Sequence, residues 1–101
     1  MKLPIKIKVG SCDYKVIERD IDVEDDYIGR LYQHKLEIYI EKALPRHRKV
    51  HTLFHEIMHA ICYEQGNMKL SEHKVDAITS GLVALFRDNP ELIELLKEGE
   101  R

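Results

Sequence analysis

The sequence predicts a small α+β domain, in which an antiparallel sheet of three or four strands from the N-terminal half packs on a long helix and one or two further helices. Hydrophobic residues alternate with polar ones as far as residue 40, which is the period of a half-buried strand. After residue 45 they recur every three or four positions, as on the buried side of an amphipathic helix. The 101 residues are 44% hydrophobic, which suits a single domain over residues 1–101 with one core.

Two hairpins are expected to build the sheet. In the first, residues 5–9 alternate aliphatic side chains with lysines, and residues 14–17 return after a turn rich in glycine, serine and aspartate. In the second, residues 27–32 and 36–40 are separated by a short turn. The acidic stretch over residues 20–26 lacks the glycine and ligand spacing of an EF-hand, so we expect a solvated connecting loop there.

The C-terminal half predicts helices with clear boundaries. Pro45 suits the first turn of a helix over about residues 46–65, and Gly66 is a good stop. Ser71 is expected to cap a second helix, and Pro90 to begin a short third one. The predicted buried side of the first helix contains Val50, Leu53, Phe54, Ile57 and Ile61. The predicted apolar stripe of the second contains Val75, Ile78, Leu82, Leu85 and Phe86.

Charge and composition exclude several classes of protein. The 16 basic and 18 acidic residues give a net charge of −2, which argues against a nucleic-acid partner. No apolar run approaches the length of a membrane span, and the N-terminus lacks the apolar region of a signal peptide. Cys12 and Cys62 do not form a disulfide framework, so a reducing compartment is expected. We therefore expect a cytoplasmic protein without nucleic-acid or membrane partners, of undetermined oligomeric state.

The segment His55-Glu56-Ile57-Met58-His59 carries the strongest chemical signal in the chain. Histidines four residues apart lie on one face of a helix, so both imidazoles can reach one ion. Glu56 follows the first histidine and can take a proton from an attacking water molecule. This is the pattern of a zinc-dependent peptidase, and it predicts Zn²⁺ as the cofactor.

A catalytic zinc ion needs a third protein ligand. The second helix offers Glu72, His73 and Asp76, and Glu72 is the preferred choice because its carboxylate would complete a two-histidine, one-carboxylate site. Asp76 lies one turn further along the same face, where it could accept the second N–H of a zinc-bound histidine. Asp76 and His73 remain alternatives for the third ligand.

Other residues near the motif have simpler explanations. His51, one turn before the first ligand, is expected at the rim of the site or in solvent, and His47 is expected to be exposed. Cys62 could bind zinc, but a small thiol packed between helices explains it better. Tyr39 and Tyr63 could stabilise an oxyanion, but packing with the hydroxyl group at the surface explains each of them better, and the sequence does not choose between them.

Residues 52–60, followed by Glu72, Asp76 and the segment over residues 87–90, resemble the small metallopeptidases of bacteria and their phages. These are related to the ImmA/IrrE family and, more broadly, to the gluzincins. The resemblance covers residues 29–90, and its HExxH core is the specific part.

The resemblance implies an α+β zincin fold in which a strand before the active-site helix can pair with an extended substrate. It makes His55 and His59 zinc ligands, Glu72 the third ligand and Glu56 the general base. The first hypothesis is therefore a minimal zinc metallopeptidase acting on a peptide or protein. The second is a zinc-stabilised, non-catalytic binding or regulatory domain that acts on a protein partner.

Overall fold

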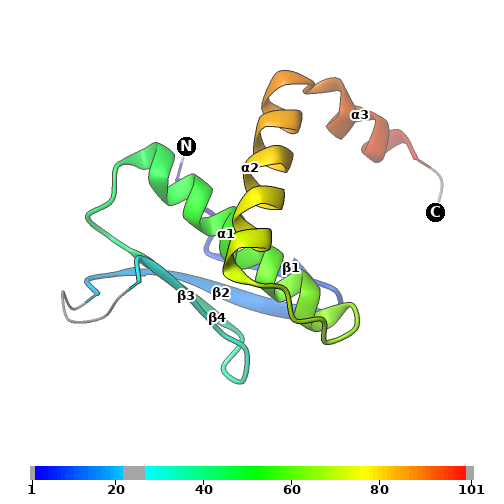
Figure 1. Cartoon of the computed structure of the whole chain (residues 1–101). Helices are drawn as coiled ribbons and strands as arrows, with labels where there is room; N and C mark the ends of the chain where they lie inside the picture. Colours follow the sequence, from blue (N-terminus) through cyan, green and yellow to red (C-terminus); the bar gives the residue numbers. More distant parts are fainter. Residues whose placement is uncertain (1, 22–26, 100–101) are drawn as a thin grey trace.

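Four strands precede three helices in the part of the chain that the computed structural model describes, residues 2–21 and 27–99 (Figure 1). The elements are β1 (Lys6–Val9), β2 (Cys12–Arg19), β3 (Gly29–Tyr32), β4 (Glu37–Glu41), α1 (Arg46–Glu64), α2 (Glu72–Asp88) and α3 (Glu91–Glu98). This order confirms the predicted α+β class and the two hairpins. The predicted acidic loop over residues 20–26 lies mostly outside the described residues.

The four strands form one open mixed sheet in the order β1-β2-β4-β3, so β1 and β3 are its edges. Both hairpins are antiparallel as predicted. β2 and β4 run parallel, with Val16 beside Ile38, so the prediction of an entirely antiparallel sheet is wrong for this central pair. Inward and outward side chains alternate in the same way in parallel and antiparallel pairs, so the hydrophobic pattern could not distinguish them.

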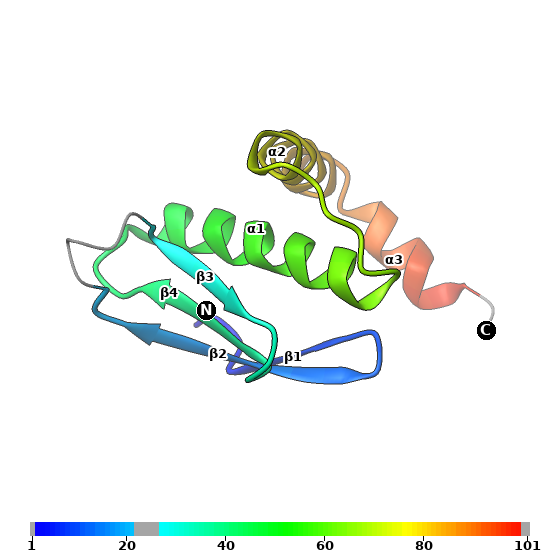
Figure 2. The same cartoon turned by 60° about the horizontal axis from the view of Figure 1, so that its bottom comes forward.

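α1 lies across one face of the sheet, and α2 lies on the opposite side of α1 (Figures 1 and 2). The main core therefore forms between the sheet and α1, and its members are Val9, Tyr14, Val16, Ile38, Ile40, Leu53 and Ala60. The Tyr14 hydroxyl donates to Glu64 Oε2 at 2.6 Å, which fixes the C-terminal end of α1 to the sheet. Burial, together with this hydrogen bond, raises the pKa of Tyr14.

The buried side of α1 differs from the predicted one. Leu53 is buried and Ile57 packs against the core, as expected, but Phe54 and Ile61 are 44% and 37% exposed. The buried residues of α1 are Thr52, Leu53, Glu56, Ala60 and Cys62. Since α1 contacts both the sheet and α2, its buried residues are not confined to one hydrophobic face, and hydrophobicity alone did not identify them. The Cys62 thiol is buried as predicted.

α2 begins as the sequence predicts but buries less of its apolar stripe. The Ser71 hydroxyl accepts a hydrogen bond from the Lys74 backbone N–H at 3.2 Å, which caps the helix. Val75 and Thr79 are the buried residues of α2, whereas Ile78 and Leu85 are exposed. This cap places Glu72 in the first turn, where α2 crosses α1.

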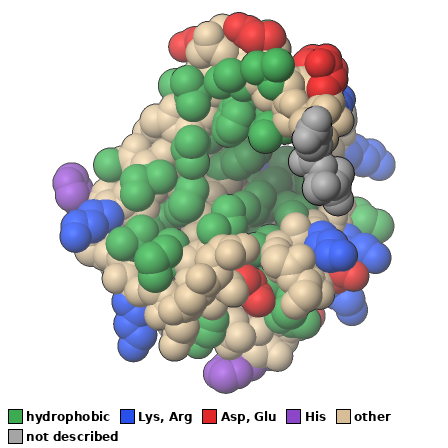
Figure 3. Space-filling view, turned by 90° about the vertical axis from the view of Figure 1, so that its right-hand side faces the viewer, with side chains coloured by type: hydrophobic (Ala, Val, Ile, Leu, Met, Phe, Trp, Pro, Cys, Tyr) green, Lys and Arg blue, Asp and Glu red, His purple; other side chains and the backbone are tan. Residues whose placement is uncertain are grey.

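The helical side of the molecule leaves much apolar surface uncovered. α3 contains no buried residue, and its Leu95 and Leu96 are 60% and 70% exposed. Figure 3 shows hydrophobic side chains gathered around a hollow on the side where the chain ends. Among the described residues, none of the helices has the length and apolar character needed to cross a membrane.

Gly29 sets the distance between β3 and α1. A Cβ atom at this position would overlap the γ-methyl group of Thr52 and would lie 3.4 Å from Glu56 Oε2. The absence of a side chain at Gly29 therefore lets α1 approach the edge strand closely, directly beside the HExxH motif.

We expect Gly29→Ala to destabilise the protein by roughly 1–3 kcal/mol, because the added methyl group must displace Thr52 or separate α1 from β3. Urea denaturation measures the change. Thr52→Ser removes the clashing γ-methyl group, so the double variant should recover much of the loss.

Gly81→Ala is the matched control. Gly81 lies inside α2, and a Cβ atom there would meet no atom within 4 Å. This substitution should stabilise the helix by about 0.5–1 kcal/mol. A Gly29→Ala protein as stable as wild type would contradict the proposed close contact.

Candidate metal centre

α1 presents His55 and His59 on the side that faces α2. Their ring centroids lie 5.0 Å apart at an interplanar angle of 68°. Their side chains are 15% and 24% exposed, so both are held in place yet reachable from solvent. This is the placement that the four-residue spacing predicts on a helix.

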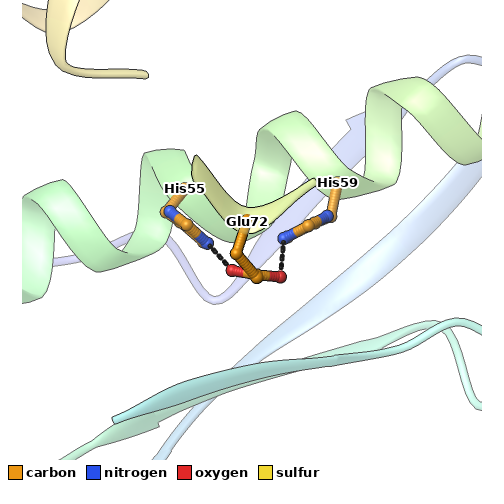
Figure 4. A group of neighbouring side chains, drawn as sticks. All are labelled: His55, His59 and Glu72. Carbon is orange, nitrogen blue, oxygen red and sulfur yellow. Dashed lines mark hydrogen bonds and ion pairs between the residues drawn. The ribbon is translucent and has the colours of Figure 1, made fainter. Parts of the chain in front are cut away.

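Glu72 reaches the two imidazoles from the first turn of α2. Its Oε2 lies 3.0 Å from His55 Nε2, and its Oε1 lies 2.9 Å from His59 Nε2 (Figure 4). The ligand atoms of His55, His59 and Glu72 all lie within 4.8 Å of one another, close enough to hold a metal ion. Among the described residues His73, the alternative ligand, does not belong to this group.

Asp76 contacts the other nitrogen of His55. Its Oδ1 lies 3.0 Å from His55 Nδ1, the position expected for a residue that orients a metal-binding histidine. Asp76 also lies 4.0 Å from His51 Nε2, which places His51 at the rim as predicted. Asp76 therefore lies next to the three-residue group rather than in it.

The donor chemistry of the group fits a cation. A neutral His55 that donates its Nδ1–H to Asp76 has a lone pair on Nε2. That lone pair faces a carboxylate oxygen of Glu72 at 3.0 Å, so a proton or a cation must lie between the two atoms to make the contact favourable. Imidazole nitrogen and carboxylate oxygen are common ligands of divalent zinc.

Glu56 lies on the side of α1 that faces β3 and is only 6% exposed. Burial raises the pKa of Glu56 to about 7, and the Glu72 carboxylate contributes to the increase. His55, Arg30 and a backbone hydrogen bond from Leu31 act in the opposite direction. Glu56 is therefore a largely desolvated carboxyl group beside the two histidines.

A groove runs along α1 on both sides of these residues. It consists of two adjoining pockets of about 680 and 650 Å³, which share Tyr27, Gly29, Glu56 and Glu72. We call them the N-terminal arm, which extends to the start of α1, and the C-terminal arm, which extends to its end. β3 contributes to one wall and α2 to the other. Of the described strands, only β4 pairs with β3, and Gly29, Arg30 and Leu31 of β3 line the groove.

Sequence reasoning missed the residues that build the groove. Gly29 is the clearest case, although a glycine inside a strand often marks a close approach of backbone. Of the two tyrosines left open, Tyr63 lines the C-terminal arm. Tyr39 donates its hydroxyl hydrogen to Glu37 instead. Buried Cys62 is not part of the three-residue group.

Comparison with known protein families gives one match. Residues 10–81 match the family model described as the IrrE N-terminal-like domain, Peptidase_M78. The matched range contains β2, β3, β4, α1 and the first part of α2, and thus every residue of the candidate site. No curated protein and no solved structure matches the chain.

We expect Glu72→Ala to lose most of the bound metal, because it removes one of three ligand groups. Asp76→Ala should keep the metal at saturating concentration but bind it about 10–100-fold more weakly, because His55 loses its orienting contact. Metal analysis of the purified proteins and zinc titration measure both effects.

His73→Ala is the control, since it removes a potential ligand from the same helical turn and should bind metal like wild type. A Glu72→Ala protein with normal metal content, or a metal-free His73→Ala protein, would show that the third ligand is assigned incorrectly.

Proposed function

Since the chain belongs to the IrrE N-terminal-like domain family (Peptidase_M78), we propose that it is a zinc-dependent metallopeptidase that cleaves a peptide bond in the groove. The main supporting observation is the convergence of His55, His59 and Glu72 beside the buried carboxyl group of Glu56. Two imidazoles and one carboxylate leave a position open for water and substrate, as in catalytic zinc sites.

His55, His59 and Glu72 would hold the zinc ion, with Asp76 keeping the Nδ1–H of His55 in place. When bound, zinc polarises the scissile carbonyl group and makes a nearby water molecule more acidic. Glu56 accepts a proton from the water as its oxygen bonds to the carbonyl carbon. Glu56 then delivers this proton to the amine nitrogen as the carbon–nitrogen bond breaks.

β3 offers a means of holding the substrate. Among the described strands it pairs on one edge alone, and its residues line the groove, where an extended peptide could add to the sheet through backbone hydrogen bonds. Glu56 lines both arms, so a peptide bound along the groove would pass close to this catalytic group. This binding mode suits a peptide or an unfolded segment of a protein.

A non-catalytic, zinc-stabilised binding domain is the second candidate function. It is favoured by one observation, which is that α2 packs chiefly on α1. Glu72 belongs to α2, whereas both histidines belong to α1, so a metal ion there would join the two helices. Metal binding would then contribute to folding without requiring turnover.

Glu56→Gln separates the two functions. We expect this variant to bind zinc normally, because Glu56 is not among the three ligand groups, and to lose peptide hydrolysis by at least about 100-fold. Zinc content, together with cleavage of a mixed library of unstructured peptides followed by mass spectrometry, provides the measurement.

Glu91→Gln is a suitable control because Glu91 is exposed at the start of α3, outside the groove. It should cleave peptides like wild type. If wild type and Glu56→Gln behave alike in cleavage, the peptidase proposal fails. A zinc-dependent increase in Tm without any cleavage would then support the binding domain.

A further inference from the structure

The N-terminal arm of the groove contains two arginines from different helices. Arg48 lies in the first turn of α1 and Arg87 in the last turn of α2, and both line this arm. Across residues 2–21 and 27–99, neither guanidinium group forms an ion pair. A guanidinium group is always charged and can bind a carboxylate through two parallel N–H donors.

We propose that the N-terminal arm is a subsite for an acidic side chain of the substrate, which Arg48 and Arg87 would bind. The inference rests on the proposed function, since it specifies which peptides that groove selects. His47 and His51 line the same arm and add further potential N–H donors.

Three carboxyl groups of the described residues line this arm, and Glu56 is the buried one. The other two are directed toward histidines. Glu72 faces the Nε2 atoms of His55 and His59. Asp76 faces His55 at 3.0 Å and His51 at 4.0 Å. The two arginines therefore remain available to an incoming carboxylate, and a metal cation nearby would increase the attraction.

The C-terminal arm has a different character. Its lining includes the largely apolar side chains of Leu31, Tyr63, Met68 and Leu70. Arg30 also lines it, but its guanidinium carbon lies 5.0 Å from the ring centre of Tyr27 and 5.4 Å from that of Tyr32. Lys69 is the other cation of this arm. The groove thus favours a peptide with an acidic residue on one side of the cleaved bond and an apolar residue on the other.

The test measures peptide binding separately from cleavage. Zinc-loaded Glu56→Gln protein is titrated with fluorescent peptides from a positional library, in which each position is fixed in turn as glutamate or glutamine. At one position, glutamate should tighten binding roughly tenfold relative to glutamine. Adding Arg48→Gln and Arg87→Gln should bring this ratio close to one, while zinc content and Tm confirm that the variants are folded.

Two matched substitutions serve as controls. Arg46→Gln changes an arginine of the same helical turn that lines neither arm, and Lys69→Gln changes a cation of the opposite arm. Both should retain the full preference for glutamate. The proposal is overturned if glutamate gives no advantage, if the advantage survives loss of both arginines, or if Arg46→Gln removes it equally.

Hydrolysis by the wild-type protein is measured in parallel and reports on the proposed function alone. Absence of cleavage with a preserved, arginine-dependent preference would refute the peptidase and keep the acidic subsite. Cleavage without that preference would keep the peptidase and refute the subsite.

Discussion

The close packing of α1 against β3 is the constraint on which the candidate site depends. Gly29 lets Thr52 lie against the strand, and Glu56, one turn later on α1, is then buried beside it. His55 and His59 project from another side of the same helix toward α2. The packing of α1 on β3 therefore directs the Glu56 carboxyl group toward the strand and the two histidines toward α2. The three side chains nevertheless remain next to one another.

Electrostatics links this arrangement to α2. The carboxyl groups of Glu56, Glu72 and Asp76 share a small volume, and the Glu72 charge helps to raise the pKa of Glu56. Such a cluster is favourable only where positive charge balances it. A cation held by His55, His59 and Glu72 would supply that charge and attach α2 to α1 at the same time. Metal binding, ionisation and helix packing would then be coupled in this domain.

The sequence predicted those features that depend on local helix geometry. The histidine spacing and the Ser71 cap depend on helix geometry alone, so the placement of His55 and His59 on one face of α1 and the start of α2 after Ser71 are confirmed. The prediction of Glu72 as the third ligand also required an assumption about where the second helix crosses the first. The parallel β2–β4 pair and the exposure of Phe54 could not be read from the sequence, because periodicity specifies faces but not the neighbours that cover them. The groove is formed between elements that are distant in sequence, so it could not be predicted from periodicity either.

The two edges of the sheet differ in how they receive additional strands. β1 carries Lys6 and Lys8 on either side of Ile7, and lysines on an edge strand oppose pairing with another chain because they would have to be brought together and desolvated. β3 instead borders the groove, where only an extended segment that fits between the sheet and α2 can approach. The lysines thus disfavour pairing of β1 with another chain, and the groove restricts which segments can pair with β3. Both features oppose polymerisation through the edges of this small open sheet.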